Sequence, residues 1–182
     1  MRIAILAAAA FMSLTVAAPA RAELEKTASL DCQGICLHVW PKIVVPDGWQ
    51  QDVQFSNAKN INFIYPANDP NNVGIYAGAR DKDGQADTVD GFRADDKAGF
   101  LKRNPGMQVN DGPVFTTADG QQLKSLDFVP SGDENWDTTF YGAETDADGH
   151  AWYLTFTISA PTKAQHDQYL PVLKQIIAAY HK

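Results

Sequence analysis

The two cysteines are the clearest residues in this chain with chemistry of their own. Cys32 and Cys36 enclose three residues and are the only cysteines in the sequence. In an oxidising compartment such a pair favours a disulfide, and Gly34 between them gives a small loop the backbone freedom it needs. Closing so short a loop removes little unfolded-state entropy, about 2 kcal/mol or less. The bridge is therefore expected to fix the segment before the first strand and to add little to global stability.

A metal site is the alternative for the same residues. His38 lies two positions after Cys36, so two thiolates and one imidazole are available to a soft metal such as copper or zinc. The Cys-x-x-x-Cys spacing resembles the copper motif of Sco proteins, which stands between a strand and a helix of a thioredoxin-like fold. Here a β-strand is expected to follow the motif. A redox-active pair is the third interpretation, and the structural disulfide is favoured over both.

The other candidate motifs are incomplete. Residues 144–149 imitate the start of a calcium loop, with acids at alternate positions and glycine sixth, but the twelfth position is Thr155 instead of a bidentate Glu. A hairpin turn accounts for Asp148-Gly149. The sequence has no zinc-hydrolase helix pattern, nucleophile turn or phosphate-binding glycine loop. Catalytic residues can be distant in sequence, so a hydrolase with a scattered site stays open.

The N-terminus has the pattern of a cleavable secretion signal. Arg2 supplies a positive charge, residues 3–16 are almost all apolar, and small residues permit cleavage after Ala20 or Ala22. The apolar run is shorter than the roughly 20 residues that span a bilayer. We therefore expect a signal peptide over residues 1–22 and a soluble, exported protein, periplasmic in a bacterium.

Length and charge narrow the class of the remaining chain. Residues 23–182 suit a single domain with a sizeable core. The whole sequence carries 15 Lys and Arg against 22 Asp and Glu, a formal net charge of −7. This acidic balance disfavours nucleic acid and anionic lipid as partners. An envelope protein or a small ligand is the expected partner, and the sequence implies no cofactor.

Asp-Gly pairs recur through the sequence and act as turn signals between short apolar runs. Two stretches have helical character, 88–102 and 162–180, with a kink or restart expected at Pro171 in the second. The predicted strands are 37–45, 60–67, 73–80, two within 107–129, 136–144 and 151–159. Because hairpins dominate, the sequence predicts an α+β fold, with a mainly antiparallel sheet of about six or seven strands and two packed helices.

The strand over residues 151–159 has strict alternation. Its apolar positions match a stripe on the last helix, so both are expected to share the core: Trp152, Leu154, Phe156 and Ile158 with Leu173, Ile176 and Ile177. The opposite face is rich in hydroxyl groups. Its residues Tyr153, Thr155 and Thr157 are the candidate surface for a partner.

The order of elements resembles the PsbP-like superfamily, which includes PsbP, DcrB and Mog proteins. The residues that suggest this are a first strand running into Pro46-Asp47-Gly48-Trp49, and the hairpin of 136–144 with 151–159 before the last helix. The resemblance implies a central antiparallel sheet with helices packed on it. It also implies a non-enzymatic binding or assembly role, by analogy of fold.

Three functional hypotheses follow. The first is a non-catalytic exported module that recognises a protein or ligand. The second is a metal-handling protein that uses Cys32, Cys36 and His38. The third is a hydrolase with a scattered site.

Overall fold

The computed structural model describes residues 24–32, 34–69, 72–117 and 120–180. The predicted signal peptide over 1–22 lies outside these residues. The elements in chain order are β1 (Leu24–Cys32), β2 (Gly34–Pro41), β3 (Trp49–Gln51), α1 (Val53–Lys59), β4 (Asn62–Pro66), β5 (Gly74–Asp81), α2 (Val89–Arg103), β6 (Gln108–Asp111), β7 (Phe115–Thr116), β8 (Gln122–Val129), β9 (Trp136–Thr145), β10 (Ala151–Ala160) and α3 (Lys163–Ala179).

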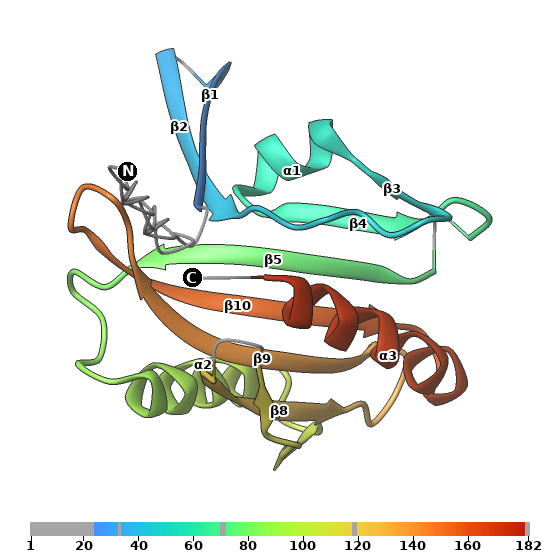
Figure 1. Cartoon of the computed structure of the whole chain (residues 1–182). Coiled ribbons are helices and arrows are strands. Elements are labelled where there is room, and N and C mark those ends of the chain that lie inside the picture. The colour runs from blue at the N-terminus through green and yellow to red at the C-terminus, as the bar shows by residue number, and fades with distance from the viewer. Residues whose placement is uncertain (1–23, 33, 70–71, 118–119, 181–182) are drawn as a thin grey trace, which may run out of the picture.

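One antiparallel sheet organises the molecule. Its strand order is β3-β4-β5-β10-β9-β8-β6, with β7 paired to β8. A separate hairpin of β1 and β2 projects from the rest of the molecule (Figure 1). The α+β fold with a mainly antiparallel sheet, predicted from the sequence, is confirmed.

The described residues contain more elements than the sequence predicted. The main sheet has eight strands instead of six or seven, since β3 and β7 span three and two residues and are too short to show alternation. A third helix, α1, follows β3. Asp52 caps it by accepting a hydrogen bond from the Phe55 amide at 2.8 Å, and Asn60 ends it in the left-handed region with φ 53°. The prediction of two helices is therefore wrong by one.

The two longer helices begin at the threonines that the sequence indicated. Thr88 caps α2 and Thr162 caps α3, each accepting from a backbone amide three residues on. α3 continues through Pro171 without the predicted restart. An interior proline costs a helix about 3 kcal/mol. Burial of the apolar stripe beyond it, which includes Leu173 and Ile177, offsets that cost at about 1.5–3 kcal/mol per side chain.

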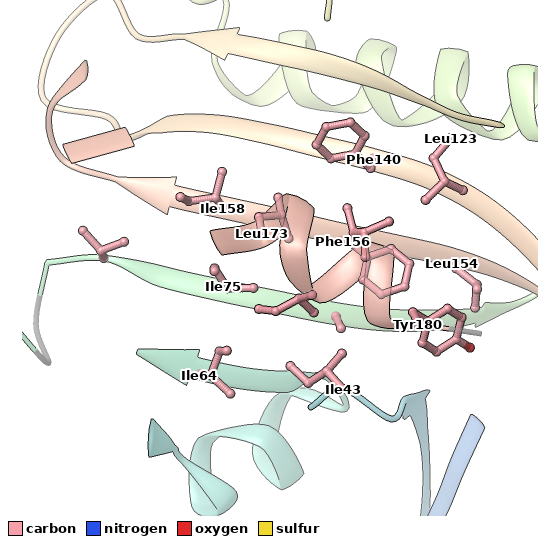
Figure 2. Close-up of a cluster of buried hydrophobic side chains, with 14 of the residues drawn as sticks. Ile43, Ile64, Ile75, Leu123, Phe140, Leu154, Phe156, Ile158, Leu173 and Tyr180 are labelled. Atoms are coloured by element: carbon pink, nitrogen blue, oxygen red, sulfur yellow. The ribbon is translucent and has the colours of Figure 1, made fainter. Parts of the chain in front are cut away.

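α3 packs on one face of the central strands and forms the larger core there. Alternate residues of β10, Leu154, Phe156 and Ile158, meet Ile75 of β5 and Leu173 of α3, as Figure 2 shows. All five side chains are at most 1% exposed. The prediction that the last hairpin and last helix share the core is confirmed. Within the described residues, no helix is both long and apolar enough to cross a membrane.

Candidate functional site

The other face of the same strands is covered only in part. Helix α2 lies on it through aromatic contacts of Phe92 and Phe100. The Phe92 ring stacks on Tyr153 with centroids 4.5 Å apart and planes at 7°, and Phe100 meets Phe128 of β8 at 4.4 Å. These contacts fix α2 over one end of β10 and over β8 and β9. The middle of β10 is left uncovered.

A second aromatic group stands on the far side of this gap. Phe63 of β4 stacks on Tyr76 of β5 at 4.9 Å, and Phe55 of α1 packs on Phe63 at 4.7 Å. Since α1, β4 and β5 carry this group, the far side is built by elements that precede α2 in the chain.

A cavity of about 550 Å³, here called the trough, opens between the two groups. Small side chains from three neighbouring strands form its floor: Gly78, Thr139, Thr155 and Thr157. One wall is α2, with Phe92, Asp96, Phe100 and Arg103, and the other is the end of α1 with the two residues that follow it, 59–61. The large rings on both sides keep the walls apart, and the small floor residues leave the space between them unfilled.

Gly78 keeps the centre of the floor open. A Cβ added there would stand 3.1 Å from the Thr155 hydroxyl oxygen and 3.4 Å from Cγ2 of Ile61. The cross-strand partner of Gly78 is Thr155, so the two positions together set the depth of the trough.

The floor presents hydroxyl groups to the cavity. The hydroxyl oxygens of Thr139 and Thr157 lie 2.9 Å apart and form one hydrogen bond with each other. Thr155 and Thr157 are half-buried, while Thr139 is nearly covered. A ligand in the trough would therefore meet hydroxyl groups that can both donate and accept.

Asp137 closes one end of the trough. Burial raises the pKa of its carboxyl to about 6, and a hydrogen bond from Ser159 opposes the rise. Its Oδ1 atom is buried and has no hydrogen-bond partner within the described part of the chain. A buried carboxylate oxygen in that condition is costly, so Asp137 is a candidate acceptor for a donor group on a ligand.

The carboxylates of the α2 wall and the rim are engaged by neighbouring groups. Asp96 accepts a hydrogen bond from the Tyr141 hydroxyl at 2.6 Å, and burial together with the Asp96 charge raises the pKa of Tyr141 well above its usual range. Asp81 accepts from the Asp83 amide at 2.8 Å and contacts His150 Nε2 at 2.7 Å. Those two interactions, the amide bond first, lower the pKa of Asp81.

A second, smaller cavity of about 250 Å³ lies beneath α3 and contains a cluster that the sequence did not reveal. The Thr138 hydroxyl oxygen is 2.6 Å from Oδ1 of Asp127 and 2.9 Å from Nε2 of His166. His166 Nδ1 is 3.3 Å from Asp167. The order hydroxyl, imidazole, carboxylate is that of a catalytic triad.

The geometry of this cluster does not activate the hydroxyl as a nucleophile. The Thr138 hydroxyl donates to the Asp127 carboxylate, so the imidazole donates to the hydroxyl oxygen and does not remove its proton. Thr138 is also 0% exposed. The cluster therefore joins β8, β9 and α3 as a buried polar network.

The three residues predicted to form the partner surface lie in two different environments. Tyr153 is 0% exposed beneath Phe92, and its hydroxyl donates to the Ala86 carbonyl. It cannot contact a partner there. Thr155 and Thr157 lie on the floor of the trough.

The cysteine segment forms the β1–β2 hairpin. The Cys32 side chain lies outside the described side chains, so neither the disulfide nor the metal site can be read from it. His38 is buried and stacks on Trp40 with centroids 5.6 Å apart. No group of three or more metal-binding side chains occurs among the described residues. The bridge between Cys32 and Cys36 stays a prediction.

The sequence that imitates a calcium loop is a hairpin turn between β9 and β10, as predicted. Asp146 organises it by accepting hydrogen bonds from the His150 amide and the Trp152 indole, each at 2.9 Å. Lys26 of β1 binds the same carboxylate at 2.9 Å, and this contact is the largest cause of its lowered pKa. The Asp146 oxygens are thus occupied by protein donors.

Comparison with solved structures gives a match of fold. No protein-family model and no curated protein matches the sequence. The structure is similar to the crystal structure of LpqN, described as involved in cell envelope biogenesis of Mycobacterium tuberculosis, with a TM-score of 0.50. The two share 16% sequence identity over 86% of this chain and 88% of LpqN. At that identity the similarity concerns the fold.

Proposed function

We propose that this chain is an exported, non-catalytic binding or assembly module of the cell envelope, and that it holds its ligand or partner in the trough. The observation that carries the proposal is an open cavity whose floor is built of small residues. Protein interiors normally fill such space, because an unfilled cavity loses dispersion contacts. A volume of about 550 Å³ falls within the range of small-molecule sites.

The chemistry of the trough favours binding over catalysis. Its described lining contains no serine, cysteine or histidine, so it offers no pair of nucleophile and imidazole base. The one triad-like cluster lies under the other face of the sheet with its hydroxyl committed to Asp127. The hydrolase hypothesis is accordingly the weaker one.

Envelope location is supported by two independent features. The first is the signal pattern over residues 1–22, which predicts a mature N-terminus at Glu23, or at Arg21 from the earlier cleavage site. The second is the similarity of fold to LpqN, a protein involved in cell envelope biogenesis. Membership of the PsbP-like superfamily is part of the same proposal, supported by the order of elements and the antiparallel sheet.

Site-specific crosslinking in intact cells tests the trough. A photoreactive amino acid at Thr155 should capture a small molecule or protein, whereas the same group at Gln168, exposed on α3, should not. Circular dichroism and thermal melting confirm that both variants fold. Equal capture at both positions, or none at Thr155, would contradict the trough as the binding site.

Export and the disulfide are tested on the same purified material. Mass spectrometry of protein from the periplasm should show cleavage before Glu23 or Arg21, and a retained Met1 would contradict export. We propose that Cys32 and Cys36 are bridged to each other. Two alkylatable thiols in the native protein would refute the bridge, and stoichiometric copper or zinc would favour the metal-handling alternative with His38.

A further inference from the structure

We propose that the trough binds an elongated organic anion, whose acidic groups meet Arg80 and Arg103 while its hydrogen-bonding body lies on the threonine floor. The inference rests on the proposed function, because it names the ligand class of the same cavity. It depends on the charges around the trough, on the placing of two guanidinium groups and on the acceptor Asp137 in the lining.

The charges around the trough leave cations available. Lys59, Arg80 and Arg103 line the cavity and are exposed, and none takes part in an ion pair within the described residues. The neighbouring carboxylates Asp96 and Asp81 are held by hydrogen bonds of their own. Both carboxylates keep their charge, and Lys59, Arg80 and Arg103 are lining cations without an ion-pair partner among the described residues, so they are available to an anion.

The lining of the trough is less acidic than the chain as a whole, because its three cations stand beside three carboxylates, those of Asp81, Asp96 and Asp137. The sequence as a whole is acidic, with a net charge of −7. Several other cations are paired: Lys26, Arg93, Lys124 and Lys163 all bind aspartates. Unpaired cations around one cavity of an acidic protein attract and orient an anion there.

Aromatic rings of α2 place the two arginines along one wall. The Arg80 guanidinium carbon lies 5.7 Å from the centre of the Phe92 ring, and that of Arg103 lies 5.7 Å from the centre of the Phe100 ring. Phe92 and Phe100 are eight residues apart on one helix, which separates them by about 12 Å along its axis. A compact single anion does not reach both groups, so an elongated ligand with separated acidic groups fits best.

The floor and Asp137 would receive the uncharged part of such a ligand. Thr155 and Thr157 supply hydroxyls between the two walls. The Asp137 carboxyl lines the same cavity, and its buried Oδ1 accepts no hydrogen bond from the described residues. Asp137 is the cross-strand partner of Phe128, on which Phe100 packs, so it lies toward the Arg103 end of the wall. An acidic group in contact with Asp137 would be repelled, so the ligand would meet it with a hydroxyl or amide donor.

Titration of the amide NMR signals with three sugars tests the inference. Fructose 1,6-bisphosphate carries two separated anionic groups, glucose 6-phosphate carries one, and glucose carries none. We expect the bisphosphate to shift the Gly78, Thr155 and Thr157 amides and to bind most tightly, with glucose weakest. Guanidinium groups form strong, two-point hydrogen bonds with phosphate, so Arg80→Gln/Arg103→Gln should weaken bisphosphate binding at least about tenfold.

The matched control is Lys102→Gln/Lys174→Gln, which removes the same charge from positions outside the lining of the trough. It should leave the affinity within about twofold, since neither side chain lines the trough to form hydrogen bonds with the bound anion. Equal shifts by glucose, with no loss in the arginine variant, would overturn the anionic ligand and leave the trough as a binding site. If no sugar shifts the trough amides, the ligand class is also overturned. Crosslinking from Thr155 then decides the proposed function separately.

Discussion

The two faces of strand β10 differ in packing: one forms part of a closed core, and the other borders an open cavity. Its even-numbered residues pack under α3, where Phe156 and Ile158 are 0% exposed. Its odd-numbered residues Thr155 and Thr157 stand in an open cavity beneath α2 and after α1. The backbone and its hydrogen bonds are common to both faces, so the difference lies wholly in the side chains.

The contrast extends to the helices that cover each face. The sheet-facing side of α3 buries an aliphatic stripe that includes Leu173 and Ile177. Among the residues of α2, only Phe92 is buried, and Phe100 is half-buried. We infer that the α3 face supplies most of the stability, and that the α2 face gives up packing to keep a cavity. The four predictions below test this inference, from the largest expected effect to the smallest.

Phe156→Ala should give the largest loss of stability. The ring is 0% exposed and meets Tyr180 edge-on at 5.3 Å, so its removal leaves a cavity in the closed core. Phe→Ala changes of this kind cost about 3–5 kcal/mol. Urea denaturation of the variant measures the free energy of unfolding. A loss below about 1 kcal/mol would show that the α3 face is not the main source of stability.

Asp137→Asn should change how stability depends on pH. Burial raises the pKa of this carboxyl from 3.8 to about 6 in the folded protein, so its folded form favours the proton. The stabilising contribution is present below the unfolded value and is lost as the pH rises through about 6. The wild type should lose up to about 3 kcal/mol over that window, and the uncharged amide of the variant should abolish this part of the loss.

Denaturation near pH 4 and near pH 8 measures the effect of this substitution. The two proteins should be similar in stability at the lower pH, and the variant should be the more stable at the higher pH. Asp133→Asn, in the exposed turn before β9, is the matched control and should leave the pH dependence unchanged. Equal pH dependence in wild type and Asp137→Asn would show that Asp137 is not a strained carboxylate of the trough.

Thr138→Val tests the polar cluster beneath α3. The substitution keeps the shape of the side chain and removes the hydroxyl that joins Asp127 to His166. Leaving two buried partners unsatisfied should cost about 1–3 kcal/mol. Thr138→Ser retains the hydroxyl and should recover most of that loss. A wild-type esterase activity that Thr138→Val abolishes would instead favour the hydrolase hypothesis.

The α3 face was largely predictable from sequence because its signal is local. Alternation along residues 151–159 and the stripe through Leu173 and Ile177 each arise within one element, and their match indicates contact. The turn at Asp148-Gly149 was equally readable, since Gly149 has a φ of 85° in the structure.

The trough was only partly predictable. The hydroxyl-rich strand was found, but the cavity needs α1, which is seven residues long and has no apolar stripe. Its cations are far apart in the chain: Lys59 ends α1, Arg80 lies near the end of β5 and Arg103 ends α2. Tyr153 differs from Thr155 and Thr157 because Phe92 of α2 covers it, which no pattern within β10 indicates.

Thr155→Ala should have the smallest effect on the free energy of unfolding, because it changes the open face of β10. The Thr155 hydroxyl makes no hydrogen bond within the described residues, and the side chain is half-buried beside open space. Its removal should change the free energy of unfolding by less than about 0.5 kcal/mol, as for surface substitutions.

The neighbouring Gly78→Ala should cost more, because the added Cβ would stand 3.1 Å from the Thr155 hydroxyl oxygen. The double variant Gly78→Ala/Thr155→Ala removes that close contact, so it should regain most of the loss caused by Gly78→Ala. Such coupling between contacting residues is what a double-mutant cycle measures. If Thr155→Ala alone destabilises the protein as much as Phe156→Ala, the floor of the trough is closely packed. Both faces of β10 would then contribute to a packed core.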